Sequence, residues 1–163
     1  MENLYKEILN YEPFCESEVK DRECMLEALR LGKDLLSRYM LMHFTASAFV
    51  VNPDRDKMLC VFHNIYQGLI YPGGHADGEE DLLSVAVREV TEETGVKPKV
   101  LGDEIFGITV NPVSGHVKRG EYVSGHTHLD VIYLMECSED VALKYNPSES
   151  SDVCWLPFSK ADG

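Results

Sequence analysis

Three glutamates, Glu89, Glu92 and Glu93, stand at spacings i, i+3 and i+4 in a segment with strong helical character, Glu80 to Thr94. At 100° per residue, this spacing puts the three side chains on one narrow face of a helix. Carboxylates so close together repel one another, so something must hold them there. Hard oxygen ligands in a cluster favour magnesium or manganese. The spacing therefore predicts a divalent-metal site on one helix face.

A simpler interpretation is a solvated acidic face, because short charge runs usually only face water. The longer pattern around the glutamates argues against it, since it should occur by chance about once in 10⁷ chains of this length. In full, the pattern is Gly74, five residues, Glu80, seven residues, Arg88, Glu89, Val90, one residue, Glu92, Glu93, one residue, Gly95 and Val96.

This pattern resembles the Nudix box at every fixed position, and the flanking segments extend the resemblance over about residues 43–158. The resemblance implies an α+β fold, the α/β/α sandwich of that family with a mixed β-sheet. It implies hydrolysis of a nucleoside diphosphate linked to another moiety, or of a similar small diphosphate substrate. Mg²⁺ or Mn²⁺ is the implied cofactor.

The resemblance also implies roles for single residues. Glu89, Glu92 and Glu93 would hold the metal, with Glu80 as a weaker ligand or a supporting carboxylate, and Arg88 would orient Glu89 through an ion pair. Such a site makes chemical sense, because a metal neutralises the diphosphate and lowers the pKa of bound water. A nearby carboxylate can then accept the proton of that water.

Gly73 and Gly74 belong to a predicted Gly-rich loop, Tyr71 to Gly78, ahead of the helix. Glycine lets the backbone bend, so we expect the free amides of the helix start to approach the phosphate and metal region.

A further acid, as metal ligand or base, is expected on a late loop before the last strand. Glu149, six residues ahead of Trp155, is the candidate. Three other acids compete with it, each with a plain surface-loop interpretation. They are Glu136, Glu139 and Asp152.

His126, His128 and Asp130 alternate and so share one face of a strand. We expect them, His128 in particular, to line the substrate cleft; a second metal site and ordinary strand-end polarity are the alternatives. Lys118 and Arg119 are expected to grip a distal phosphate, or else to form a solvated loop tip.

Several elements must position these residues. Residues 1–42 form a helical N-terminal extension with an amphipathic stretch at 16–38, and residues 43–163 form the catalytic domain. A β-hairpin is predicted from 44–51 and 58–62, with later strands at 100–110, 129–135 and 153–156. A long loop, 111–127, is expected between two of them.

The box helix covers one face of the sheet, and relatives commonly cover the other with a C-terminal helix. Only seven residues follow Leu156. We therefore expect the N-terminal helix to pack on the sheet, or beside it, as a replacement, with a dimer interface as the alternative cover. A monomer and a homodimer both fit the sequence.

Bulk properties restrict the partners. The chain has 163 residues and a formal net charge of −13. Such a surface repels nucleic acid polymers, and the absence of an 18-residue apolar run predicts no membrane span. Five scattered cysteines without a Cys-x-x-Cys pair indicate reduced thiols and a cytoplasmic location.

Two other functions fit the same fold. A catalytically silent nucleotide sensor would have lost box glutamates, whereas this chain keeps all of them. A diphosphate isomerase would need a cysteine and a glutamate facing an apolar pocket. Hydrolysis is the better interpretation of the intact box.

Overall fold

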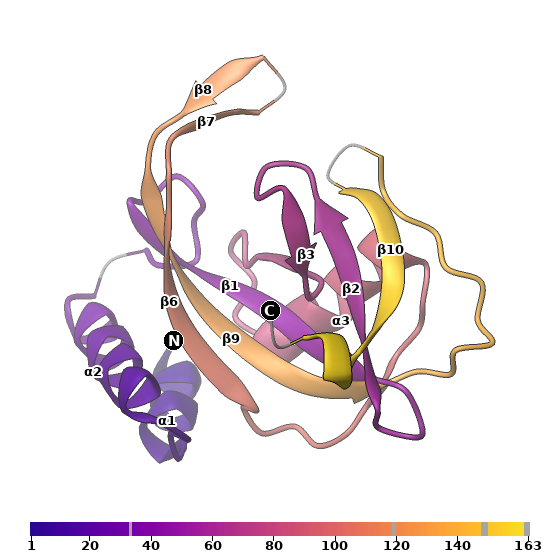
Figure 1. Ribbon diagram of the computed structural model, residues 1–163. Helices are drawn as coiled ribbons and strands as arrows, with labels where there is room; N and C mark the ends of the chain where they lie inside the picture. The colour runs from indigo at the N-terminus through magenta and orange to yellow at the C-terminus, as the bar shows by residue number, and fades with distance from the viewer. Residues whose placement is uncertain (33, 119, 148–149, 162–163) are drawn as a thin grey trace.

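A curved, mixed β-sheet forms the centre of the computed structural model, which describes residues 1–32, 34–118, 120–147 and 150–161 (Figure 1). The main strand order is β10-β2-β1-β9-β5, and β3, β4 and β6 pair with β2, β1 and β9 respectively. Strands β1 and β9 run parallel, and the other pairs are antiparallel. The strands are β1 (Met42–Val51), β2 (Lys57–His63), β3 (Gly68–Ile70), β4 (Gly73–His75), β5 (Lys99–Val100), β6 (Gly107–Val113), β9 (His126–Glu136) and β10 (Ser150–Pro157).

Strand β1 lies at the middle of the sheet and is buried on both faces. Its apolar face carries Phe44, Ala46, Ala48 and Val50, each fully buried. The alternate positions carry His43, Thr45 and Ser47, which are buried as well. Because successive side chains of a strand point to opposite faces, β1 separates an apolar core from a buried polar face.

Helix α3 (Leu82–Thr94) packs on the apolar face of the sheet. Its N-terminus is capped by Asp81, whose carboxylate accepts a hydrogen bond from the Ser84 amide over 3.0 Å. Its C-terminus ends at Gly95, which takes the left-handed conformation with φ 71°. The side chains that it buries in the core are Leu82, Val85, Ala86 and Val90.

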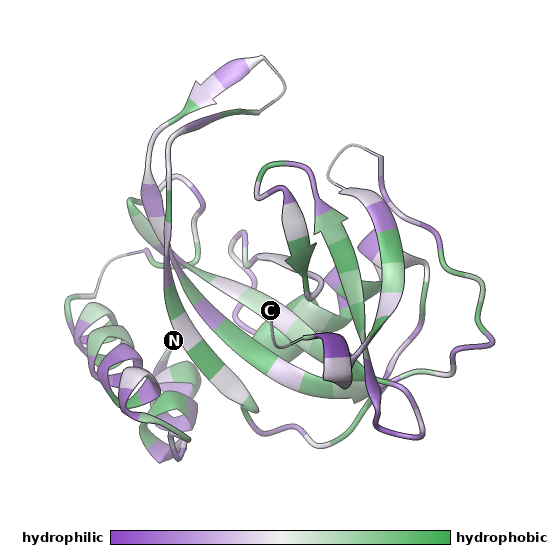
Figure 2. Cartoon of the chain, in the orientation of Figure 1, coloured by the Kyte–Doolittle hydropathy of each residue, from purple (hydrophilic) through white to green (hydrophobic). Residues whose placement is uncertain are grey.

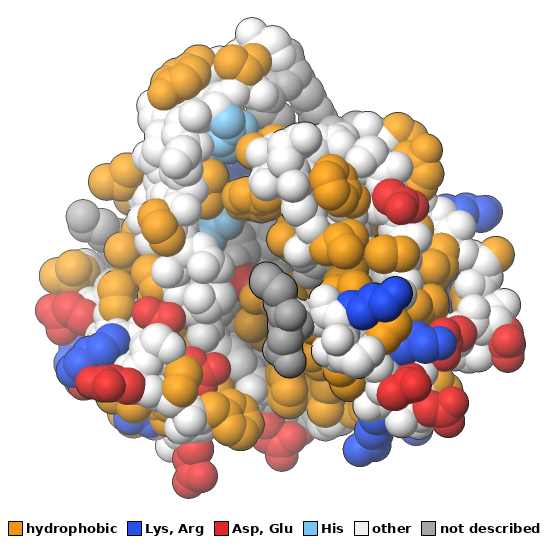
Figure 3. Space-filling model, viewed as in Figure 1, with side chains coloured by type: hydrophobic (Ala, Val, Ile, Leu, Met, Phe, Trp, Pro, Cys, Tyr) orange, Lys and Arg blue, Asp and Glu red, His pale blue; other side chains and the backbone are white. Residues whose placement is uncertain are grey.

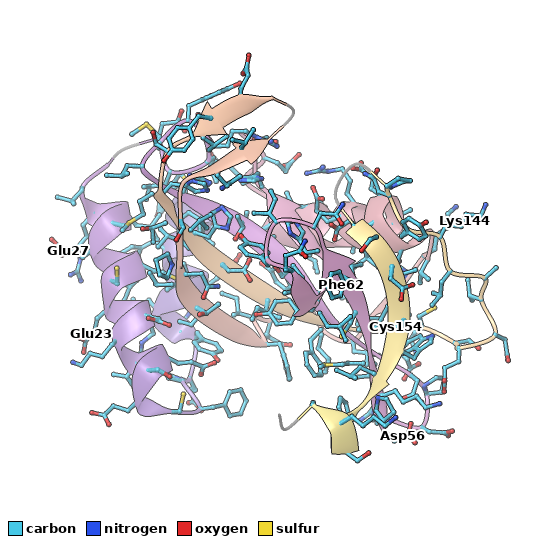
Figure 4. All side chains as sticks on the ribbon, turned by 45° about the horizontal axis from the view of Figure 1, so that its top comes forward. Glu23, Glu27, Asp56, Phe62, Lys144 and Cys154 are labelled. Atoms are coloured by element: carbon cyan, nitrogen blue, oxygen red, sulfur yellow. The ribbon has the colours of Figure 1, made fainter. Side chains whose placement is uncertain are left out.

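Two N-terminal helices, α1 (Glu2–Asn10) and α2 (Glu16–Arg30), pack against this same core. Hydrophobic and hydrophilic residues alternate along both helices (Figure 2). Leu4, Ile8 and Met25 are buried, whereas Glu23 and Glu27 point away from the sheet (Figure 4). Helix α2 thus lies along the edge strand β6, where the Val110 amide donates a hydrogen bond to Asp21 over 3.1 Å, and α1 packs against α2.

The segment 111–127, which the sequence indicates as a loop, contains strand structure. Strand β6 continues to Val113 and β9 already begins at His126. Between them, β7 (His116–Lys118) and β8 (Glu121–Val123) form a hairpin that projects beyond the sheet (Figure 1). The predicted strand 100–110 is also divided, into β5 and β6.

An α+β fold with a mixed sheet, as expected from the sequence, is confirmed. Within the described part of the chain, no helix is both long and apolar enough to cross a membrane.

Candidate active site

Glu93 is a buried acid on the face of α3 that meets strand β4. Only 3% of the residue is exposed, and its carboxylate accepts a hydrogen bond from the backbone N–H of Gly73 over 3.0 Å. A buried carboxylate is costly unless hydrogen bonds compensate for the lost water. The β4 backbone supplies one such bond and so fixes where this acid sits.

Glu89 lies one helical turn before Glu93 and packs on the next residue of β4. A Cβ added to Gly74 would lie 2.4–2.7 Å from the three carboxyl atoms of Glu89. Only glycine permits this approach. The carboxylates of Glu89 and Glu93 therefore meet the backbone of two consecutive residues.

The two glycines act here by leaving space. The predicted Gly-rich loop is wrong at this point, because Gly73–His75 is a strand that pairs antiparallel with Thr45–Ser47 of β1. The contacts also fall two to three turns into α3, and not at its start. Glycine is needed in this strand for a steric reason, because a Cβ on Gly73 would lie 2.1 Å from Oγ of Ser47.

Arg88 lies beside the same acids. Its guanidinium donates to Glu89 over 2.8 Å and lies 3.9 Å from the carboxylate of Glu92. The Glu89 side chain is 12% exposed and that of Glu92 is 58% exposed. The helix face thus carries a gradient from a buried acid, Glu93, to a solvent-facing one, Glu92.

Glu80 lies ahead of α3 and is engaged elsewhere. Its carboxylate forms a 2.6 Å ion pair with the N-terminal amine of Met1, and its side chain is 66% exposed. In this arrangement the Glu80 carboxylate is engaged at the start of α1.

The structure places the candidate acids outside the box in different surroundings. Glu149 and Arg119 lie outside the described residues. Glu139 forms an ion pair with Lys57 over 2.6 Å, which holds the pKa of this carboxyl below its ordinary value. Glu136 ends β9, and Asp152 lies exposed on β10.

His128 belongs to a cluster of four histidines on the polar face of the sheet. The other members are His43, His75 and His126. Histidine side chains are visible in the hollow between the β7–β8 hairpin and the β2–β3 part of the sheet (Figure 3). Sequence reasoning identified the His126–His128 alternation but missed His43 and His75, which come from other strands.

Asp130 continues this polar face. The Thr45 and Ser47 hydroxyls donate to one of its oxygens over 2.7 and 2.9 Å. Burial raises the pKa of Asp130 to about 6, although the two hydroxyls act in the opposite direction. The alternation of His43, Thr45 and Ser47 matches that of the predicted β9 residues, and this is the signal that could have indicated a shared polar face.

Comparison with known proteins agrees with this geometry. Residues 41–163 match the family model described as the NUDIX domain. A curated relative, a probable DHNTP pyrophosphohydrolase of Lactococcus lactis, is 32% identical over 117 residues, which cover 72% of this chain and 62% of that protein. A CMP-5'-(N-acetyl-N-hydroxy-3-aminopropyl)phosphonate hydrolase of Streptomyces rubellomurinus is 26% identical over 134 residues, covering 80% of this chain and 59% of that protein.

The chain thus spans roughly three fifths of the length of these two relatives. A solved hydrolase of the NUDIX family from Clostridium perfringens superposes with a TM-score of 0.50 at 22% identity, covering 71% of this chain and 81% of that one. This likeness confirms the expected fold. With the family model matched over most of the chain, the protein belongs to the NUDIX domain family.

Proposed function

We propose that this chain hydrolyses a pyrophosphate bond in a small organic diphosphate, with a divalent cation held by Glu89, Glu92 and Glu93. The observation that carries the proposal is the convergence of Glu89 and Glu93 on the Gly73–Gly74 backbone. Family membership supports it, as do the names of the two relatives, one a pyrophosphohydrolase and the other a hydrolase of a CMP-linked compound.

The donor set fits Mg²⁺ or Mn²⁺, because both prefer oxygen ligands. Arg88 contributes one positive charge beside two of the three carboxylates. A divalent cation would balance the two negative charges that remain. When bound, such a cation neutralises the diphosphate and acidifies a water molecule.

The residues of the chain have distinct tasks in this proposal. Glu93 is held by the Gly73 amide, whereas Arg88 orients Glu89. Glu92 is exposed and can turn toward a cation at little desolvation cost. A carboxylate of this group would accept the proton of the attacking water.

The test is a screen of nucleotide sugars, dinucleoside polyphosphates, NADH, ADP-ribose and nucleoside triphosphates with Mg²⁺, with Mn²⁺ and with a chelator. Glu92→Gln and Glu93→Gln should each lower turnover of the best substrate by about 10²-fold or more. Glu23→Gln, an exposed change on α2, is the control and should retain turnover. Turnover that survives excess chelator would refute the metal mechanism.

The same screen separates an enzyme from a nucleotide sensor. Binding of one of these compounds without release of product, at every metal condition, would favour the sensor. For the enzyme, the rate should rise with pH toward the alkaline side, because a carboxylate of the glutamate group would accept the proton of the attacking water and a bound cation would favour loss of that proton. A rate that peaks near pH 5 and falls by neutrality would contradict this mechanism.

A further inference from the structure

The four-histidine cluster has the dimensions of a metal site. His43 comes from β1, His75 from β4, and His126 and His128 from β9. One ring nitrogen of each lies within 4.8 Å of those of the other three. The register of the sheet brings them together, because His43 pairs with His128 and Thr45 pairs with His75. Three strands therefore aim imidazoles at one point.

His43 has an unused nitrogen at the centre of this arrangement. The residue is 1% exposed, and its Nδ1 lies 2.8 Å from the carbonyl oxygen of Met40. A carbonyl only accepts, so Nδ1 carries the proton and Nε2 presents a lone pair. That Nε2 is buried and has no hydrogen-bond partner among the residues that the structure describes. Leaving a buried polar atom unpaired is costly, and such atoms call for a physical explanation.

His126 repeats the same arrangement. Its Nδ1 lies 2.9 Å from the carbonyl oxygen of Ser124, which assigns the proton to Nδ1 and the lone pair to Nε2. Its Nε2 is 3.1 Å from Nε2 of His128. A backbone carbonyl that holds the far N–H is the usual support of a metal-bound histidine, because it fixes the tautomer and the ring orientation.

We infer that His43, His75, His126 and His128 form a binding site for a borderline transition-metal cation of the Zn²⁺ type. Tetrahedral nitrogen ligands at about 2.0–2.1 Å from zinc are separated from one another by about 3.3 Å. The His126–His128 pair is already close to that separation. Small side-chain rotations would bring in the other ligand atoms, and a cation would satisfy the lone pair of His43.

A neighbouring positive charge is already neutralised. Arg38, whose charge reaches His43 and His75, is ion-paired with Asp77, which reduces its repulsion of an incoming cation.

This site is separate from the proposed glutamate site and selects a different ion. A Cβ built on Gly74 of β4 would point toward Glu89 of α3. Successive residues of a strand face opposite sides, so His75 faces the other side of the sheet. All-imidazole ligation suits zinc, copper, nickel or iron, whereas magnesium prefers oxygen. The inference therefore does not depend on the proposed hydrolysis.

The test is a titration of the full-length protein, stripped of metal by a chelator, with Co²⁺ in the presence of excess Mg²⁺. Tetrahedral Co²⁺ gives strong visible absorption, which octahedral Co²⁺ on carboxylates does not. We expect one equivalent of Co²⁺ to produce the bands and Zn²⁺ to abolish them. Absence of these bands in the wild-type protein would overturn the inference.

Matched variants identify the ligands. His126→Gln and His128→Gln, both at partly exposed positions, should weaken Co²⁺ binding by about tenfold or more. His116→Gln, on the neighbouring hairpin and outside the cluster, should bind Co²⁺ like the wild type. Circular dichroism verifies that each variant is folded. If both cluster variants bind Co²⁺ like the wild type, or if Glu92→Gln removes the bands, the histidine site is refuted.

Discussion

The backbone N–H of Gly73 donates a hydrogen bond to the carboxylate of Glu93, twenty residues further along the chain, over 3.0 Å. Gly73 is in turn fixed by its pairing with Ser47 of β1. A hydrogen bond from a strand thus helps to position a candidate catalytic acid on α3. Small changes on that strand should therefore alter the acids before they alter the fold.

Gly74→Ala should disable the glutamate site with little loss of secondary structure. The new Cβ would lie 2.4–2.7 Å from the carboxyl atoms of Glu89 and would push this side chain away. Because catalysis is sensitive to misplacement of about 1 Å, hydrolysis should fall by about 10²-fold. The measurement is turnover with Mg²⁺ on the best substrate of the screen.

Gly68→Ala is the matched control for this change. Gly68 also lies on a short strand, but an added Cβ would meet only the carbonyl oxygen of Tyr66, at 3.8 Å. It should retain turnover. Equal activity of both alanine variants would mean that the close approach of Gly74 to Glu89 has no catalytic importance.

Local signals explain which parts of the fold could be predicted. Helix α3 was predicted almost to its ends, because Asp81 caps its start and Gly95 takes the left-handed conformation at its end. The Arg88–Glu89 ion pair joins neighbouring residues and was expected from the box. Such features depend on a few adjacent residues, so the sequence contains the whole signal.

Features made by long-range pairing could not be predicted in the same way. His43 and His75 join the β9 histidines only through the register of β1 with β4 and β9. The Gly73–Gly74 segment has the composition of a loop, yet tertiary packing against Ser47 and Glu89 makes it a strand. The β7–β8 hairpin was missed because its strands are only three residues long.

Asp81→Ala should destabilise α3 at neutral pH by about 1 kcal/mol, the usual contribution of an N-cap. The hydrogen bonds from the Ser84 hydroxyl and amide lower the pKa of Asp81. A lowered folded-state pKa means stability that is present above the unfolded pKa, about 3.9, and lost as pH falls through the folded value. Urea unfolding at pH 7 and at pH 3 should therefore show the difference from wild type shrinking in acid.

The exposed carboxylate Asp103 provides the control for the cap. Asp103→Ala should change the free energy of unfolding by less than about 0.5 kcal/mol at both pH values. A deficit of the Asp81 variant that stays constant down to pH 3 would show that the charged cap is not its cause.

Cys15 should be the fastest-reacting of the five thiols. It is exposed, and its hydrogen bond with the Ser17 hydroxyl lowers its pKa, which increases the thiolate fraction at pH 7.5. Burial raises the pKa of Cys60 to about 11. Iodoacetamide labelling followed by peptide mass analysis should modify Cys15 first and Cys60 only on unfolding. Removing Cys15 in Cys15→Ser should abolish the fastest labelling of the native protein, whereas the control Cys60→Ser should leave that labelling unchanged. Equally fast labelling in Cys15→Ser would contradict this assignment.

Met25→Ala should destabilise the whole domain, because α2 contributes to the core that α3 shares. Met25 is fully buried in that core, together with Leu4 and Ile8 of α1. Truncating a buried methionine leaves a cavity and typically costs about 2–5 kcal/mol.

Leu31→Ala, just past the end of α2, is the control, since Leu31 is 64% exposed and should change stability by about 0.5 kcal/mol or less. Urea unfolding should be monitored both by circular dichroism and by fluorescence of Trp155, which packs against this core from the far strand β10. We expect one transition, shifted equally for both probes. A Trp155 transition that is unchanged in Met25→Ala would show that the N-terminal helices unfold separately from the sheet.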